Sequence, residues 1–227
     1  MKDMTGVGAC ADQGARRHVL WTLLRYAGWL VALALLCQGL YLYASANDAT
    51  TQFSEASLAE MSQNVMLVLS LLLLWRIRTL GQYRHVAVML FGLLLASLIR
   101  EQDRLLDAVF DNLWQWLVTL VAVPVLLYMI RYRHRLLDEL GAFMQSAPFG
   151  IFSAGFMTLY LFSRLIGRGD YWQAVMAERY HYPTKSAVEE SVEVLGYALM
   201  LIALVELWLL CRRLRVGARA CIKNERA

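Results

Sequence analysis

The sequence contains few prolines, few cysteines and few charged residues for its length. Its 227 residues include 3 Pro and 4 Cys, and Asp, Glu, Lys and Arg make up 18% of the chain, against about 25% in typical soluble domains. The scarcity of proline and the lack of a low-complexity segment argue against a linker to a separate soluble module. The cysteines match no zinc or redox spacing, and none lies in a segment that we place outside, so we predict no disulfide. Histidine is also scarce, and its 4 residues form no H-x-x-x-H or H-E-x-x-H metal motif.

The sequence is instead rich in long apolar runs. Hydrophobic residues make up 59% of the chain, whereas about 45–50% is usual in soluble domains. Such runs indicate membrane-spanning helices, and no strand-like alternation competes with this interpretation. We predict an all-α integral membrane protein with six transmembrane helices in one bundle. The predicted spans are approximately residues 18–43, 57–75, 86–100, 108–130, 149–166 and 187–210.

The distribution of Lys and Arg predicts the orientation of the chain. Fifteen of them lie in the two terminal tails and in the 76–84 and 131–135 connections, whereas six lie on the other side of the spans. Because cytoplasmic loops are rich in Lys and Arg, we expect both termini in the cytoplasm. The predicted organisation is a cytoplasmic tail (1–17), a six-span membrane domain (18–211) and a basic cytoplasmic tail (212–227). Since topology accounts for the basic residues, we expect the lipid bilayer, and no nucleic acid, as a partner.

The first predicted span has a second interpretation. Residues 43–46 read "YASA", an A-x-A-like cleavage site that follows the apolar run 29–42. A secretory signal removed after Ala46 would produce the same pattern. We favour an uncleaved helix, because the full apolar stretch is longer than the apolar core of a usual signal peptide.

Acidic residues gather on the side opposite to the basic residues. The rule that sets orientation gives little weight to acids, so their bias needs its own explanation. Twelve of the eighteen lie on the outer side: Asp48, Glu55, Glu60, Glu101, Asp103, Asp107, Asp111, Asp170, Glu178, Glu189, Glu190 and Glu193.

Three of the predicted spans are too short to cross a bilayer with apolar residues alone. A helix needs about 20 residues to cross, but the uninterrupted apolar parts of these spans are only 65–75, 86–99 and 194–210. Each helix must therefore draw polar residues down to the outer boundary. Some polar residues lie at this depth, and others lie on the same helix face as one that does. Together they are Glu60, Gln63, Asn64, Arg100, Glu101, Glu189 and Glu193.

Helical spacing predicts that these groups form one polar pocket open to the outer side. Glu60 and Asn64 are four residues apart, as are Glu189 and Glu193, so each pair shares a helix face. We assign the roles as follows. The expected catalytic residues are Glu60, Glu101 and Glu193; the expected metal ligands are Glu60, Glu101, Glu189 and Glu193; and the expected substrate-binding residues are Arg100, Asn64 and Arg164.

A structural interpretation and a docking surface stand beside the functional one. Ser57 with Glu60, and Ser186 with Glu189, fit the S-x-x-E capping box, and acids in a first turn favour the helix dipole. Capping leaves Glu193 unexplained, because it lies a full turn deeper. The same charges could also pair with one another or dock a partner protein.

The chemistry of these groups favours hydrolysis or group transfer. Carboxylates, amides and hydroxyls are hard oxygen ligands that suit Ca²⁺, Mg²⁺ or Mn²⁺. A metal-activated water could then attack an ester, amide or phosphodiester. We expect a hydrolase or transferase that acts on a lipid-like substrate of the outer leaflet, in a bacterial-type inner (plasma) membrane. The alternatives are a cation- or proton-coupled transporter and a non-catalytic docking subunit of an envelope complex.

The order of polar positions is similar to that of alkaline ceramidases, which carry Ser-x-x-x-His, an Asp and His-x-x-x-His on successive spans. The corresponding positions are Ser97 with Glu101, then Asp107 or Asp111, then the acids at 189 and 193. Glutamate therefore stands at each histidine position, and the predicted spans number six where that family has seven. The resemblance implies a similar layout only, and the missing imidazoles argue against zinc.

Overall fold

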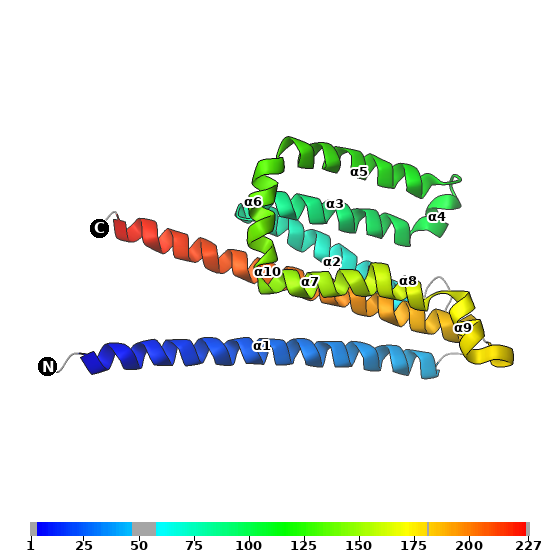
Figure 1. The fold of residues 1–227 in the computed structure, drawn as a ribbon, viewed down its shortest axis with the longest axis horizontal. Helices are drawn as coiled ribbons and strands as arrows, with labels where there is room; N and C mark the ends of the chain where they lie inside the picture. Colours follow the sequence, from blue (N-terminus) through cyan, green and yellow to red (C-terminus); the bar gives the residue numbers. More distant parts are fainter. Residues whose placement is uncertain (1–3, 47–57, 181, 226–227) are drawn as a thin grey trace. The chain divides into compact units, whose positions relative to one another are not determined.

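The computed structural model describes residues 4–46, 58–180 and 182–225, and every element within these ranges is a helix (Figure 1). The chain divides into two compact units, Met1–Asn47 and Asp48–Ala227. The first unit consists of α1 (Met4–Ala46), which includes the apolar stretch Val19–Tyr43. The proposed cleavage site thus falls at the last residue of α1. Residues 47–57, which include the acids at 48 and 55 and the serine at 57, lie outside the described residues.

The second unit begins with a helical hairpin. In α2 (Leu58–Leu80), buried residues recur at a spacing of three and four, as at Ser70, Leu74 and Ile77, which gives one face to the core. The helix ends at Leu80, and the next residue, Gly81, has a φ of 93°, in the left-handed region that favours glycine. The chain then reverses into α3 (Arg84–Glu101), which packs along α2.

The next helices return the chain to the opposite end of the bundle. A single turn, α4 (Asp103–Asp107), leads into α5 (Leu113–Arg131), which packs against α3 and has no buried residue. The predicted spans leave no helix between the fourth and the fifth, but α6 (Arg133–Met144) lies there and buries Leu136 and Phe143. This helix crosses the end of the bundle (Figure 1).

The last helices form the pair that supports the site. Three segments follow one another without a break: α7 (Ala147–Met157), the π-helix η1 (Thr158–Phe162) and α8 (Ser163–Ile166). After α9 (Gly169–Met176) and η2 (Ala177–Arg179), the long α10 (Tyr182–Glu225) packs against α7, η1, α8 and α2. Its buried residues include Val194, Tyr197, Leu204 and Leu207, so α10 is the central helix of the unit.

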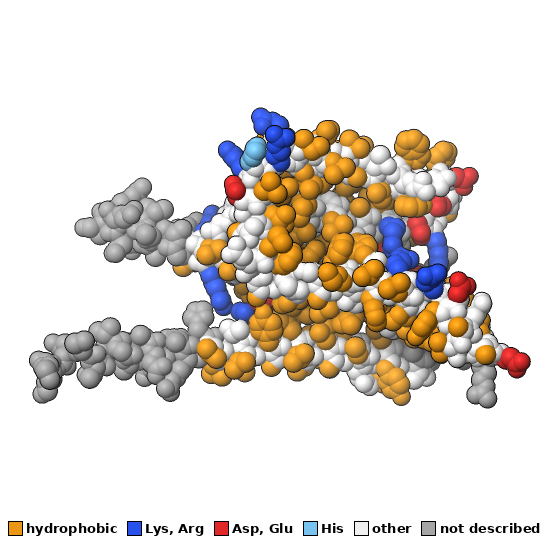
Figure 2. All heavy atoms as spheres, viewed as in Figure 1, with side chains coloured by type: hydrophobic (Ala, Val, Ile, Leu, Met, Phe, Trp, Pro, Cys, Tyr) orange, Lys and Arg blue, Asp and Glu red, His pale blue; other side chains and the backbone are white. Residues whose placement is uncertain are grey.

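Five described helical stretches are long and apolar enough to cross a membrane: Val19–Tyr43, Leu58–Leu80, Leu113–Arg131, Ala147–Ile166 and Tyr182–Val216. The remaining predicted span corresponds to α3, whose 18 residues include the charged Arg84, Arg100 and Glu101 at its two ends. Hydrophobic side chains cover the flank of the second unit (Figure 2). An exposed apolar surface of this extent is typical of helices that face lipid.

The two ends of the second unit differ in charge, and we name them accordingly. The acidic end is where α2 and α10 begin and α3 ends. The basic end is where α2 ends and α3 begins, and it carries Arg76, Arg78, Arg84, Arg131, Arg133 and Arg135.

Candidate functional site

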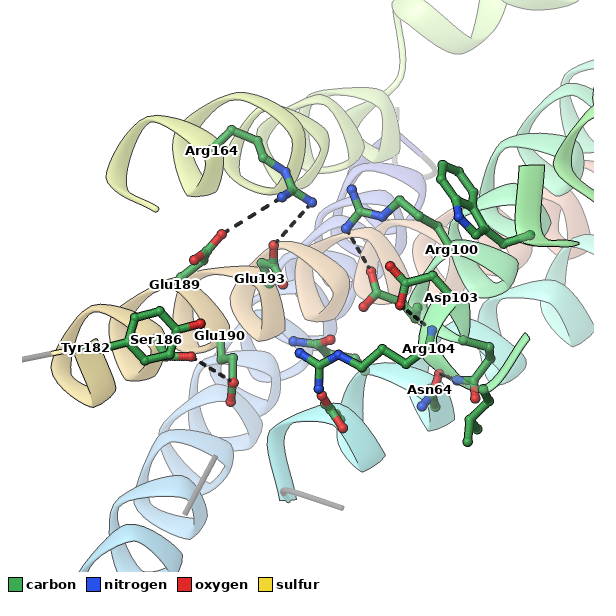
Figure 3. Close-up of a pocket in the computed structure, with 16 residues that line it drawn as sticks. Asn64, Arg100, Asp103, Arg104, Arg164, Tyr182, Ser186, Glu189, Glu190 and Glu193 are labelled. Carbon is green, nitrogen blue, oxygen red and sulfur yellow. Dashed lines mark hydrogen bonds and ion pairs between the residues drawn. The ribbon is translucent and has the colours of Figure 1, made fainter. Parts of the chain in front are cut away.

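A polar pocket with a volume of about 430 Å³ opens at the acidic end of the second unit (Figure 3). Helices α2, α3, α4, α8 and α10 all contribute to it, together with the connection before α4 and the start of α5. Six carboxylates and three guanidinium groups line the pocket, so its charge is mixed but acidic on balance. The lining residues are Glu60, Gln63, Asn64, Arg100, Glu101, Gln102, Asp103, Arg104, Leu105, Trp114, Arg164, Tyr182, Ser186, Glu189, Glu190 and Glu193.

All seven residues that the sequence analysis named as site residues line this pocket: Glu60, Asn64, Arg100, Glu101, Arg164, Glu189 and Glu193. Asp107 and Asp111, the acids considered for the following span, do not belong to the lining. The structure thus brings the named residues together from four helices. Their chemical roles stay predictions.

Arg164 on α8 connects two of the α10 carboxylates. Its Nη1 lies 3.9 Å from Oε1 of Glu189, and its Nη2 lies 3.7 Å from Oε1 of Glu193. Glu193 is only 8% exposed, so the guanidinium partly offsets the cost of placing this carboxylate inside the bundle. Glu189 has a second cationic partner, because Nζ of Lys185 lies 2.7 Å from its Oε2. Gly167 makes room for Glu189, since a Cβ there would lie 2.4 Å from Oε1.

Arg100 and Glu101 bring α3 into the same site. Nη2 of Arg100 donates to Oε1 of Glu101 over 3.1 Å, and the hydroxyl of Tyr197 donates to the same oxygen over 2.7 Å. The side chains of Arg100 and Arg164 point toward one another in Figure 3, and the charges of both act on Glu193. The buried carboxylate Glu193 therefore lies near two guanidinium groups that come from different helices.

The α2 side of the pocket is held by an amide contact. Nε2 of Gln102 donates to Oδ1 of Asn64 over 2.8 Å, which links the end of α3 to α2. Gln63 is 2% exposed, and its Nε2 has no hydrogen-bond partner among the residues that the structure describes. On α10, the hydroxyl of Ser186 donates to Oε1 of Glu190 over 3.4 Å, whereas the buried Oε2 of Glu190 has no partner within the described part of the chain.

Beneath the pocket, hydroxyl groups continue the polar contacts into the bundle. The fully buried Ser163 donates to the carbonyl oxygen of Leu159 over 2.6 Å and lies 3.4 Å from Oε1 of Glu193. The hydroxyl of Ser97 donates to the Leu93 carbonyl over 2.9 Å. Ser97 also makes a short hydrogen bond with Tyr160.

Tyr160 belongs to the π-helix η1, and Arg164 follows it by one turn. A π-helix adds a residue to a turn, and such segments occur frequently at functional sites. The extra residue changes the directions of the side chains that follow. Sequence periodicity does not reveal this change, because the surrounding residues remain apolar. Tyr160 and Ser163 were therefore not singled out, although their spacing to Arg164 places them on the same helical segment.

The capping interpretation of Ser186 and Glu189 is wrong. Helix α10 already begins at Tyr182, so Ser186 lies inside the helix and its side chain contacts Glu190. The proposed partner Ser57 of Glu60 lies outside the described residues. Ion pairing, the other structural interpretation, does occur, since Arg100, Arg164 and Lys185 all contact carboxylates.

The predicted metal site stays a prediction. Within residues 4–46, 58–180 and 182–225, the structure places no three or more His, Cys, Asp or Glu side chains in a group that could hold a metal ion. Glu101, Glu189 and Glu193 instead contact cationic side chains. Compared with protein-family models, with curated proteins and with solved structures, the chain matches none.

Proposed function

We propose that the protein is a membrane-embedded hydrolase or transferase whose site, at the outer end of a helical bundle, acts on a lipid-like substrate. One observation carries this proposal. The buried carboxylate Glu193 lies 3.7 Å from Arg164, in a pocket of about 430 Å³ that also holds Glu101 and Glu60. The pocket volume falls within the range of about 300–1,000 Å³ that is usual for small-molecule sites.

The membrane context is six crossings with both termini in the cytoplasm, in a bacterial-type inner membrane. Helix α2 runs from the acidic end to the basic end, and α5 runs in the same direction, so α3 has to bring the chain back between them (Figure 1). At about 1.5 Å per residue, its 18 residues extend about 27 Å, close to the hydrocarbon thickness of about 30 Å. The three charged residues of α3 lie at its ends, where they reach the interfaces. These features support a sixth crossing.

The carboxylates serve as acid–base groups in this proposal. A carboxylate next to the reacting atoms can accept a proton from an attacking water and later return it to the leaving group. Glu193 takes this role because Arg164 and Ser163, two neighbouring residues of α8, both contact its Oε1. Glu101, which accepts from Tyr197 and Arg100, is the second acid–base group, and Glu60 is the third candidate.

The guanidinium groups stabilise negative charge that develops on the substrate. Arg100 and Arg164 are 34% and 49% exposed at their side chains, so each can contact both a carboxylate and a bound molecule. Positively charged donors that face a reacting centre in a partly water-excluded site contribute strongly to catalysis. Asn64 completes the binding residues on the α2 side.

The test is turnover of lipid by the reconstituted full chain. The protein is incubated with vesicles made from a total lipid extract of the membrane that contains it, and lipids are followed by mass spectrometry. We expect one lipid species to be consumed, and Glu193→Gln to lower the rate about 10²- to 10⁴-fold, the usual contribution of a general acid–base group. Glu178→Gln, which changes an exposed glutamate outside the pocket, is the matched control and should leave the rate unchanged. No change in any lipid with the wild-type chain would contradict the enzymatic proposal.

A divalent metal would add a nucleophile to the same site, and its test is separate. Metal content of the purified protein is compared between wild type, Glu60→Gln and Glu193→Gln after equilibration with Ca²⁺, Mg²⁺ or Mn²⁺. Metal retained by wild type and lost in both variants would support the predicted ligands. The alternatives, a cation- or proton-coupled carrier and a docking subunit, predict uptake by vesicles or a co-purifying partner without lipid turnover.

A further inference from the structure

The charge balance of the pocket restricts what its occupant can be. Six carboxylates repel a phosphate group, and cationic side chains already pair with three of them, Glu101, Glu189 and Glu193, which weakens the attraction of the pocket for a simple cation. A hydroxyl group suits both, because it donates to a carboxylate oxygen and accepts from a guanidinium N–H. The mixed lining therefore favours a neutral group with several hydroxyls.

Gln63 supplies an independent observation. The residue lines the pocket and is 2% exposed, and its buried Nε2 donor has no partner in the described ranges. Leaving a buried donor unsatisfied costs about 1–3 kcal/mol, so such a group points to an acceptor on a bound molecule. A hydroxyl oxygen is such an acceptor, whereas an ammonium group has none.

Glu190 supplies the complementary acceptor from α10. Its side chain lines the pocket, and its buried Oε2 has no partner within the described residues. Gln63 and Glu60 are three residues apart, so they lie on the same face of α2. The α2 and α10 walls thus hold one unused donor and one unused acceptor among the residues that line the pocket.

We infer that the pocket binds a neutral, hydroxyl-rich head group, a polyol or sugar carried on a lipid, with Gln63 donating to one hydroxyl and Glu190 accepting from another. This inference rests on the proposed function and names the substrate class of that site. Arg100 and Arg164 then contact hydroxyl oxygens on the opposite wall, where they also hold the carboxylates of α3 and α10 in place.

The test is selective retention of lipids by the full chain in a sugar-free detergent, measured by native mass spectrometry. The three probes are glucosyl-diacylglycerol, which is neutral and rich in hydroxyls, phosphatidic acid, which is anionic, and stearylamine, which is cationic. We expect the glucosyl lipid to be retained in preference to the other two. Gln63→Leu and Glu190→Gln should each weaken its retention about three- to tenfold, the effect of one lost hydrogen bond. Gln115→Leu and Glu178→Gln, at exposed positions outside the pocket, are the matched controls and should change nothing.

The outcomes separate this inference from the proposal on which it rests. Preferential retention of phosphatidic acid or stearylamine, weakened by changes in the pocket, overturns the hydroxyl-rich head group but leaves a lipid site intact. Retention of none of the three lipids overturns both. If Gln63→Leu does not fold, the test rests on Glu190→Gln, which changes a partly exposed residue. Unaltered retention of the glucosyl lipid by Glu190→Gln then overturns the inference. Added glucose distinguishes a site for a lipid head group from a site for a free sugar. It displaces the lipid only if the site recognises the sugar alone and the acyl chains contribute nothing to binding.

Discussion

At the scale of single residues, the position of each carboxylate is set by what lies next to it. Gly167 is an example, because a Cβ there would lie 2.4 Å from Oε1 and 2.5 Å from Cδ of Glu189. Both atoms belong to the end of a flexible side chain. An added methyl group therefore moves the carboxylate and leaves the helices in place.

We predict that Gly167→Ala lowers lipid turnover with little loss of stability. Displacement of the Glu189 carboxylate disturbs its contacts with Lys185 and Arg164, but the backbone stays in place, so we expect the free energy of unfolding to change by less than about 0.5 kcal/mol. The measurements are the rate of the proposed reaction and the unfolding midpoint. Gly169→Ala, where a Cβ meets nothing within 4 Å, is the control. A large drop in the midpoint for Gly167→Ala alone would show that the backbone cannot accommodate the methyl group.

At the scale of elements, α7 and α10 approach each other through two glycines. A Cβ on Gly155 would lie 2.8 Å from the carbonyl oxygen of Gly196, and a Cβ on Gly196 would lie 2.8 Å from Cβ of Leu159. Small residues at a helix crossing allow such close contact, which is the main source of helix association in membranes. This crossing also sets the distance between η1 and α10, and so between Arg164 and Glu193.

Gly155→Ala should destabilise the protein by about 1–3 kcal/mol, because the helices have to separate to relieve contact with backbone atoms. Gly150 lies on the same helix, and a Cβ there meets nothing within 4 Å. Gly150→Ala should therefore be neutral or stabilising by up to about 1 kcal/mol through helix propensity. Unfolding of both variants in a mixed detergent titration checks the difference. Equal stability of the Gly155→Ala and Gly150→Ala variants would mean that α7 and α10 lie farther apart at Gly155 than the structure shows.

A second element-scale contact lies at the basic end, where Glu139 on α6 caps the start of α3. Its Oε2 accepts from the backbone N–H of His85 over 2.7 Å and of Val86 over 3.0 Å, and its Oε1 lies 2.7 Å from Nδ1 of His85. A carboxylate at a helix N-terminus satisfies free N–H groups and favours the helix dipole. This contact fixes α6, a helix without a spanning role, against the bundle.

Removal of this cap by Glu139→Ala should lower the free energy of unfolding by about 1–3 kcal/mol, because two buried N–H groups lose their acceptor. The neighbouring Asp138 is exposed, so Asp138→Ala serves as a control with the same loss of charge. Hydrogen exchange at the start of α3 provides a local measurement. Exchange there should accelerate in Glu139→Ala only, and protection that persists would show that the cap is dispensable.

At the scale of the whole molecule, apolar runs were enough to place the long helices. The last predicted span began at 187, whereas α10 begins at Tyr182, because the polar first turns of a helix carry no apolar signal. Helix α6 was missed since it is short and lies across the end of the bundle with only Leu136 and Phe143 buried. The predicted spans before and after α6 already accounted for the apolar runs, so the segment between them was treated as a loop.

The grouping of the site residues could be argued from span length, but their contacts could not. Short apolar runs imply that polar ends reach the membrane boundary, and the structure places Glu60, Glu101 and Glu193 around one pocket. The contacts depend on the rotation of each helix, which the π-helix η1 changes locally. For this reason Tyr160 and Ser163, one turn beneath the pocket, carried no signal in the sequence.

The orientation of the molecule gives a final prediction, which concerns the side from which the pocket is reached. Single cysteines are introduced at exposed positions by Asp170→Cys in α9, Arg133→Cys in α6 and Val216→Cys in α10, in a chain whose native cysteines are replaced. If six helices cross and the basic end faces the cytoplasm, a membrane-impermeant maleimide labels only the Asp170→Cys variant in intact cells, and the other two after permeabilisation. Labelling of Arg133→Cys and Val216→Cys alone would invert the orientation and move the pocket to the cytoplasmic face. Labelling of Asp170→Cys and Arg133→Cys from the same side would contradict the crossing of the continuous α7–η1–α8 segment, which separates the two positions, and with it the six-span topology.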